Sequence, residues 1–185
     1  MSNCGIFLDQ GHYTWRHNSV LNSIIGLIRP SLGPTFQLFS DLPGFEAPHG
    51  GTIPPHILVT NLRPNLFIVS ETLQRAIVFE LTCPWDSNVS RSHTYKQEKY
   101  APLVADLSRR FTVFHFSVEV SVRGQISAEN QNRIRALVFR CCDTPGKLAG
   151  KIVKCSSKAS LLASFSIFCA RKEPAWLNPA PLLIN

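Results

Sequence analysis

Two apolar segments, each with a polar residue near one end, contain the side chains that are best suited to chemistry. Asn65 directly precedes the apolar residues 66–69, and Glu80 lies near the end of the run 77–82. Residues 70–75 between them are mostly polar and long enough to reverse the chain, so a hairpin is expected. Hairpin pairing would bring Asn65 and Glu80 to the same end of a sheet, where their oxygens could hold a divalent cation such as Mg²⁺.

A cation held in this way would suit a metal-dependent phosphodiesterase, which also needs a positive group to orient water or to stabilise developing charge. Lys96 and Lys99 are the candidates for this group, because they lie one turn apart on the next predicted helix. Taken singly, Glu80 is typical of a surface acid at a strand end. The two lysines, taken singly, are typical of a solvated helix face. Only their combination in this order indicates a site.

The elements that must position these residues follow from apolar periodicity and from proline and glycine. Residues 14–28 have apolar side chains at helical spacing, with Thr14 as the expected N-cap and Pro30 beyond the end. Residues 112–122 alternate in hydrophobicity and form the clearest strand. Pro102 is expected to kink or divide a helix at 87–110. The other predicted elements are strands at 35–39, 56–60, 65–70 and 75–82 and helices at 127–141 and 145–170.

This order predicts an α/β fold with a mixed central sheet flanked by helices, in which strand 112–122 lies beside strand 77–82 after a right-handed crossover. The 185 residues suffice for one domain, and 44% hydrophobic with 17% charged residues is typical of a folded chain. The sequence shows neither a secretory signal nor a run of ~18 apolar residues, so we expect an intracellular protein that does not span a membrane.

Charge and cysteine content bear on the partners. Lys and Arg number 19 against 12 Asp and Glu, which indicates nucleic acid as the partner or simply a basic, soluble surface. The six cysteines include no CxxC pair and are interpreted as reduced thiols. Cys4, His12 and His17 have ligand-like side chains, but without a second cysteine nearby they do not make a closed zinc site. No zinc site is therefore predicted.

Several motifs together resemble one family. The run GHYTWRHNSVL at 11–21 resembles the GRYTWRHDxVL motif found near the C-termini of metazoan non-LTR retrotransposon polyproteins. The resemblance continues through FSDLPG at 39–44, TIPP at 52–55, RPN at 63–65 and ELTCPW at 80–85. It extends over 96–100 and 118–124 and ends near 167–171 and Trp176, so it covers almost the whole chain.

Such polyproteins encode a reverse transcriptase, then a cysteine–histidine knuckle, then a restriction-endonuclease-like domain of the PD-(D/E)XK type. The resemblance implies that this chain is the last part, without the reverse transcriptase. It implies an N-terminal segment 1–30 with a remnant of the knuckle and the first helix, an endonuclease-like core at 31–171, and a loose tail at 172–185.

The resemblance also implies roles for single residues. On the family pattern Asn65 replaces the first metal-binding Asp, and Glu80 keeps the second acid. Thr82 occupies the usual Lys position, and family members with Thr there use a helix lysine, which matches Lys96 or Lys99. The implied cofactor is Mg²⁺ or Mn²⁺, with Asn65 and Glu80 as the ligands.

Three hypotheses follow. The chain is a degenerate endonuclease domain that nicked DNA for target-primed reverse transcription in the ancestral element, or an inactive nucleic-acid-binding module, or a genomic relic with no selected role. DNA is the expected partner, and a functional protein would be nuclear. The residues expected to form a positive surface near the site are Arg63, Arg91, Lys96, Lys99 and Arg123.

Overall fold

The structure is a computed structural model that describes residues 11–48, 50–170 and 181. Within these residues the strands are β1 (Gln37–Ser40), β2 (Leu66–Ser70), β3 (Arg75–Thr82) and β4 (Thr112–Glu119). The α-helices are α2 (His12–Ile28), α3 (Val89–Leu107), α4 (Ala128–Cys141) and α5 (Pro145–Cys169). Short 3-10 helices occur at η1 (Arg29–Ser31) and η2 (Asp86–Asn88).

The described strands form one mixed sheet in the order β1-β2-β3-β4. β1, β2 and β3 are successively antiparallel, and β4 pairs in parallel with β3 after the crossover through α3. Leu66 pairs with Phe79, which places Asn65 directly beyond β2 and next to Glu80. The predicted mixed sheet, the hairpin and the parallel neighbour of β3 are therefore confirmed.

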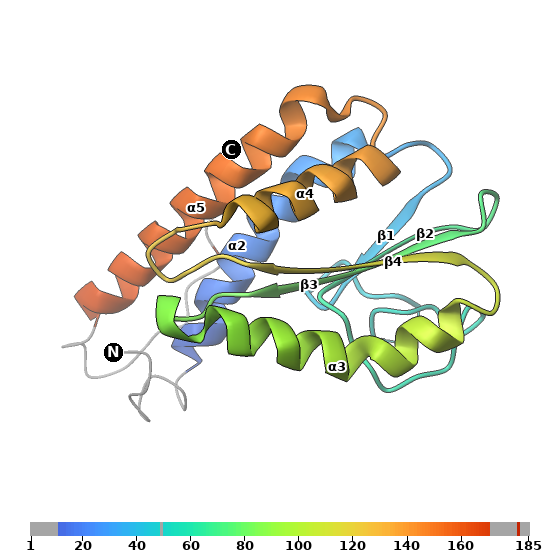
Figure 1. The fold of residues 1–185 in the computed structure, drawn as a ribbon, viewed down its shortest axis with the longest axis horizontal. Helices are drawn as coiled ribbons and strands as arrows, with labels where there is room; N and C mark the ends of the chain where they lie inside the picture. Colours follow the sequence, from blue (N-terminus) through green and yellow to red (C-terminus); the bar gives the residue numbers. More distant parts are fainter. Residues whose placement is uncertain (1–10, 49, 171–180, 182–185) are drawn as a thin grey trace.

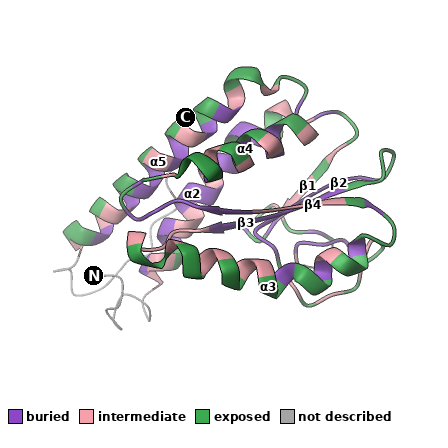
Figure 2. Ribbon diagram, in the orientation of Figure 1, coloured by how far each residue is buried: buried purple, intermediate pink, exposed green. Residues whose placement is uncertain are grey.

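The sheet separates two layers of helix. Helices α2, α4 and α5 cover one face and α3 covers the other (Figure 1). Side chains such as Ile77, Phe79 and Leu81 pack with the three-helix layer, whereas Ala76 and Val78 pack against α3. Strands β2 and β3 are buried on both faces (Figure 2), which explains their nearly continuous apolar sequence.

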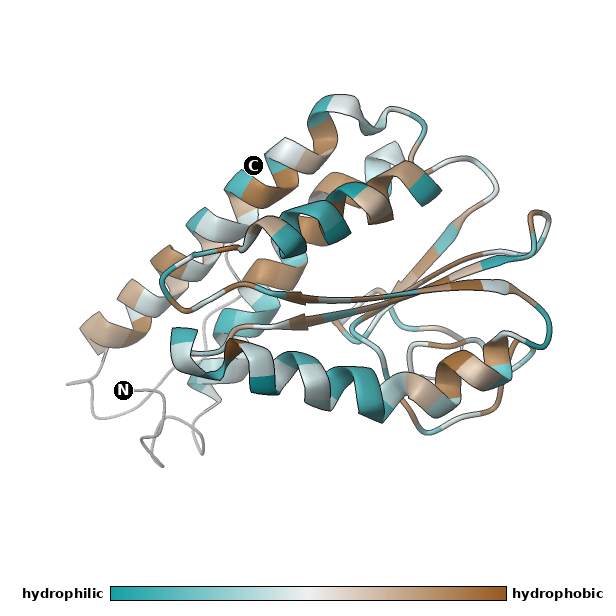
Figure 3. Cartoon of the chain, in the orientation of Figure 1, coloured by the Kyte–Doolittle hydropathy of each residue, from teal (hydrophilic) through white to brown (hydrophobic). Residues whose placement is uncertain are grey.

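Helix α3 changes character along its length. Its first turns are hydrophilic and its last turns are hydrophobic (Figure 3), and the buried residues are Tyr100, Leu103 and Leu107. The helix continues through Pro102 without division, because the proline lies near the C-terminal end, where the lost bond interrupts few turns. The expectation was that Pro102 kinks or divides the helix; division is wrong, and the kink stays a prediction.

Other differences concern element ends. The first helix begins at His12, and its N-cap is Gly11, which has a left-handed backbone (φ 73°), so Thr14 is not the N-cap. The strand expected at 56–60 does not form: residues 55–57 are a turn, in which the Ile57 amide donates to the Pro54 carbonyl oxygen at 2.9 Å, and residues 58–60 have no regular structure. The strand expected to reach residue 122 ends at Glu119, beyond which the Val120 amide still bonds the Thr82 carbonyl oxygen at 3.0 Å.

Helix α5 is the described helix that is long and apolar enough, by length and composition, to cross a membrane. Its apolar side also has a partner within the protein, since Ala149, Ile152, Cys155 and Ala159 belong to the main hydrophobic core. A core helix of this kind passes the same test, so the finding is weak support for a membrane span. The expected tail at 172–185 lies outside the described residues apart from Pro181.

Candidate active site

Asn65 joins the ends of β2 and β3 through its backbone and its side chain. Its amide N–H donates to Glu80 Oε1 at 2.9 Å, and its side-chain Oδ1 accepts the Leu81 N–H at 2.8 Å. Asn65 thus continues the ladder with side-chain atoms where the strand itself has ended. The residue is 6% exposed, so these bonds replace hydration that it has lost on folding.

Glu80 points to the α3 face of the sheet because it alternates with Phe79 and Leu81, which face the other layer. Its Oε2 lies 2.5 Å from Lys96 Nζ, and its side chain is fully buried, whereas that of Lys96 is 17% exposed. Burial raises the pKa of Glu80, and Lys96 together with the Asn65 amide acts in the opposite direction. Glu80 and Lys96 therefore form a largely desolvated ion pair.

Tyr100 supports this pair from the next turn of α3. Its hydroxyl donates to the Arg63 carbonyl oxygen at 2.8 Å, which ties α3 to the chain just before Asn65. Lys99 Nζ and Lys96 Nζ lie 4.9 and 5.6 Å from the centre of the Tyr100 ring. Burial, and then the Glu80 carboxylate, raise the pKa of Tyr100, so the phenol stays protonated and serves as a donor.

Two residues that were not predicted complete the surroundings of Asn65. Its Nδ2 donates to Asp41 Oδ2 at 2.9 Å, and its Oδ1 lies 3.3 Å from His17 Nε2. Asp41 follows β1, and His17 lies on α2, so both arrive from elements far away in the sequence. The motifs at 11–21 and 39–44 contained both residues, but local spacing could not show that they meet Asn65.

The remaining predicted residues lie further out. Arg123 pairs with Asp86, with 2.6 Å from its Nε to Oδ2, and Arg91 is exposed on the first turn of α3. Within the described residues, no hydrogen bond or ion pair joins Arg91 or Arg123 to the Glu80–Lys96 pair. Thr82, in the position of the usual lysine, buries a hydroxyl that has no partner there. Cys4 lies outside the described residues, and His17 faces Asn65.

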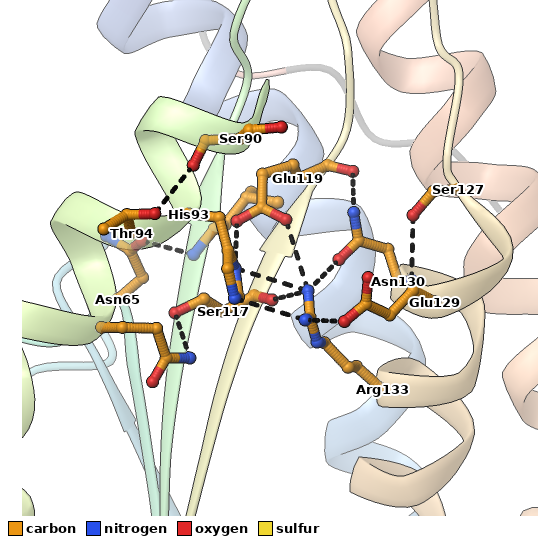
Figure 4. Close-up of polar contacts among 12 residues, drawn as sticks. Asn65, Ser90, His93, Thr94, Ser117, Glu119, Ser127, Glu129, Asn130 and Arg133 are labelled. Carbon is orange, nitrogen blue, oxygen red and sulfur yellow. Dashed lines mark hydrogen bonds and ion pairs between the residues drawn. The ribbon is translucent and has the colours of Figure 1, made fainter. Parts of the chain in front are cut away.

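A second buried polar cluster lies along the same face, toward the end of β4. Glu119 is 3% exposed and lies between His93 of α3, at 3.1 Å, and Arg133 of α4, at 3.6 Å (Figure 4). Arg133 also donates to the Ser117 carbonyl oxygen at 3.2 Å. Ser117 and Glu119 occupy the strand positions between the buried apolar ones, and this alternation was the available sign that they share a face with Glu80.

The oxygen atoms that could bind a metal ion already accept hydrogen bonds within the protein. Both Glu80 oxygens, the Asn65 Oδ1 and the Asp41 Oδ2 each have a partner. The described residues include no group of three or more His, Cys, Asp or Glu side chains that could hold a metal ion. A divalent cation would have to displace the Lys96 ammonium, so these residues, as they stand, do not fit the cation that the family resemblance implies.

No protein-family model matches the chain, and no curated protein sequence matches it.

Proposed function

We propose that this chain is a degenerate endonuclease-like domain of retrotransposon origin, of the PD-(D/E)XK type, that has kept the arrangement of its site but lost most of its affinity for Mg²⁺. The observation that supports the proposal is the convergence of Asn65, Glu80 and Lys96 at one end of the sheet. Lys96 and Lys99 are both candidates for the lysine of the site, and it is Lys96 that contacts Glu80. Asn65 directly precedes β2, Glu80 lies on β3 and Lys96 lies on α3, and this chain order agrees with the motif order.

The substitution at position 65 accounts for the degeneration. A carboxylate there would give two charged ligands, whereas the Asn65 amide is neutral and donates a hydrogen atom toward Asp41. With Asn65 neutral, the Glu80 carboxylate is paired with the Lys96 ammonium and the Asp41 carboxylate accepts the Asn65 Nδ2 hydrogen bond, so neither acid of the site is left free to attract a cation. Its basic surroundings, Arg63 and Lys99, remain exposed for contact with DNA phosphates.

An inactive nucleic-acid-binding module is the second candidate. It is favoured by the 2.5 Å contact between Lys96 and Glu80. In this contact the ammonium and the carboxylate neutralise each other and are not directed toward a substrate. In that case the fold and the basic residues would serve binding alone, with DNA still the partner.

Nicking of supercoiled plasmid separates the candidates. In Mg²⁺ or Mn²⁺ we expect the parent to nick barely above an EDTA control, Asn65→Asp to nick clearly faster, and Glu80→Gln added to Asn65→Asp to abolish the gain. DNA binding without nicking in all three would favour the binding module. Absence of both nicking and DNA binding would contradict both candidates and leave the relic as the explanation.

A further inference from the structure

A cavity of about 270 Å³ lies beside the candidate active site, where the end of β3 meets the first turns of α2 and α3. Its lining includes Arg16 of α2, Trp85 from the β3–α3 connection and Ser92 of α3. Trp85 follows Glu80 closely in the sequence, and Ser92 is one turn before Lys96 on α3. The cavity is therefore a neighbour of the site and not part of it.

The feature that needs explanation is the charge of Arg16. The residue is 7% exposed, and its Nη2 donates to the Cys83 carbonyl oxygen at 3.1 Å. Its Nε has no hydrogen-bond partner, and within the described residues no carboxylate pairs with the guanidinium. The Tyr13 ring lies 5.2 Å from Arg16 Cζ and presents the face of its π-system to the guanidinium. Burial lowers the pKa of Arg16, as expected for a cation that lacks a counter-ion.

Arg133, one of the partly buried arginines of α4, shows what a guanidinium compensated by acids looks like in this fold. Arg133 contacts two carboxylates, those of Glu119 and Glu129, and it also donates to backbone and amide oxygens. The Arg16 guanidinium, by contrast, donates to one backbone carbonyl oxygen, that of Cys83. A buried arginine without an acid, at the wall of a cavity, is the arrangement of a site that receives its anion from a ligand.

The other walls of the cavity suit one kind of anion. Tyr13 and Trp85 add aromatic surface on which a base can stack, and Asn88 and Ser92 add side chains that can hydrogen-bond phosphate or sugar oxygens. Arginine matches phosphate oxygens in a fork geometry that lysine does not provide. Aromatic rings beside a guanidinium are the combination used to bind single-stranded nucleic acid.

We propose that this cavity is a subsite that binds one phosphate of a nucleic-acid strand through Arg16, with the adjacent base against Trp85. The assignment of the ligand as a nucleic-acid strand rests on the proposed function, whereas the presence of an anion subsite does not. The subsite would anchor the strand next to Glu80 and Lys96 and would set the register of the phosphate presented to them.

The test is binding of a fluorescein-labelled, single-stranded thymidine oligonucleotide, measured by anisotropy in low salt with inorganic phosphate and thymidine 5′-monophosphate as competitors. Arg16→Met should weaken binding at least about tenfold, because it removes a charge-assisted contact. Arg16→Lys keeps the positive charge but not the fork geometry of the guanidinium. Its affinity for the oligonucleotide should therefore lie between that of the parent and that of Arg16→Met. Lys151→Met, on the outer side of α5, removes the same charge and should leave binding unchanged.

A second pair of variants protects the test against misfolding of Arg16→Met. Asn88→Ala and Ser92→Ala alter the cavity wall without touching the buried guanidinium, and each should weaken binding by about threefold. If both bind like the parent and Arg16→Lys does as well, the subsite proposal is overturned. If inorganic phosphate displaces the oligonucleotide as well as thymidine 5′-monophosphate does, the base adds nothing to binding and the assignment to nucleic acid is overturned.

Failure of the endonuclease proposal and failure of the subsite proposal give different experimental results. If no variant nicks DNA in any metal but oligonucleotide binding depends on Arg16, the endonuclease proposal fails and the subsite stands. If Asn65→Asp restores nicking and Arg16→Met neither slows it nor weakens binding, the subsite fails and the endonuclease proposal stands.

Discussion

At the scale of the residue, the hydrogen bonds of Asn65 require an amide. Its Oδ1 accepts from Leu81 N–H while its Nδ2 donates to Asp41, and only an amide offers an acceptor and a donor at these two places. A carboxylate of the same shape would satisfy Leu81 and oppose Asp41. The Asn65 amide therefore stabilises the nearby Asp41 carboxylate by a hydrogen bond, as a bound cation would do between two carboxylates.

This contact predicts a conditional cost for Asn65→Asp. In EDTA the variant should lose about 2 kcal/mol of unfolding free energy, since two carboxylates would lie where a 2.9 Å hydrogen bond now forms. Millimolar Mg²⁺ or Mn²⁺ should recover much of the loss, because an ion bound only by the folded state stabilises it. Urea unfolding with and without metal measures both effects. The control is Asn65→Asp with Asp41→Asn, which should lose the cost in EDTA, because an amide again lies opposite the acid.

The Glu80–Lys96 pair predicts a pH dependence. Because the folded state raises the pKa of Glu80, it binds that proton more readily than the unfolded state, and stability falls as pH rises through the interval between the two pKa values. Lys96→Met removes the main opposing influence, so the pKa should rise further and the interval should extend to higher pH.

At neutral pH Lys96→Met should cost about 3 kcal/mol, and the cost should shrink on acidification toward about pH 4. Urea unfolding across this range is the measurement. Glu80→Gln with Lys96→Met should regain most of the stability and lose the pH dependence. A Lys96→Met variant with the same loss at every pH would show that the lysine contributes packing and not charge.

At the scale of the element, α3 positions most of the polar chemistry. His93, Lys96, Gln97 and Tyr100 repeat at helical spacing and reach Glu119, Glu80, Ser117 and the Arg63 carbonyl, respectively. The helix is fixed by its apolar C-terminal turns, so its hydrophilic N-terminal half is presented to the sheet as one row of side chains. A shift of α3 by one residue would break every contact in the row.

Helix α5 fixes the end of β4 through the turn at Gly124. The Ser160 and Ser164 hydroxyls donate to the Ser121 and Val122 carbonyl oxygens, both at 2.7 Å. Gly124 has a φ of +76°, and a Cβ there would lie 2.5 Å from the Ser157 carbonyl oxygen. The turn and the helix are thus in contact at a point where no side chain fits.

Gly124→Ala should therefore cost about 3 kcal/mol or more in urea unfolding, from strain and collision together. Gly44→Ala is the matched control, because it has the same kind of backbone (φ +84°) with no atom within 4 Å of the added Cβ. Gly44→Ala should lose only about 1 kcal/mol of unfolding free energy, which is the cost of placing a residue with a Cβ in a left-handed backbone conformation. Equal losses would mean that α5 moves aside freely and does not fix the turn.

The contrast between predicted and observed elements has a physical cause. Elements with long periodic patterns, such as β3 and α5, were predicted almost to the residue because their own side chains specify burial. The segment 56–60 has β-branched and apolar residues but pairs with no strand in the described part of the chain, and a strand exists only where a partner completes its ladder. The Asn65–Glu80 proximity was predictable from hairpin register, whereas Asp41, His17 and Arg133 arrive through tertiary contacts that no local pattern contains.

At the scale of the whole molecule, the basic residues lie on two different layers. Arg63 and Lys99 accompany α3 on one side of the sheet, and Lys151 and Lys154 lie exposed on α5 in the opposite layer (Figure 1). α5 has four lysines and no acidic residue, so its surface is at least as positive as that of the candidate site. The net charge of +7 alone therefore does not say which layer meets nucleic acid.

Salt dependence of DNA binding distinguishes the layers. Binding of a short duplex should be non-specific and should weaken steeply as salt increases, because each neutralised phosphate releases a counter-ion. If the α3 side is the DNA surface, Arg63→Gln with Lys99→Gln should reduce the slope of log K against log salt by up to about 2, and Lys151→Gln with Lys154→Gln should leave it unchanged. Both pairs remove two exposed positive charges, so long-range attraction changes equally in the two variants. A reduction for the α5 pair alone would move the DNA surface away from Glu80 and separate binding from the candidate site. Equal reductions would mean that net charge, and not a defined face, attracts the DNA.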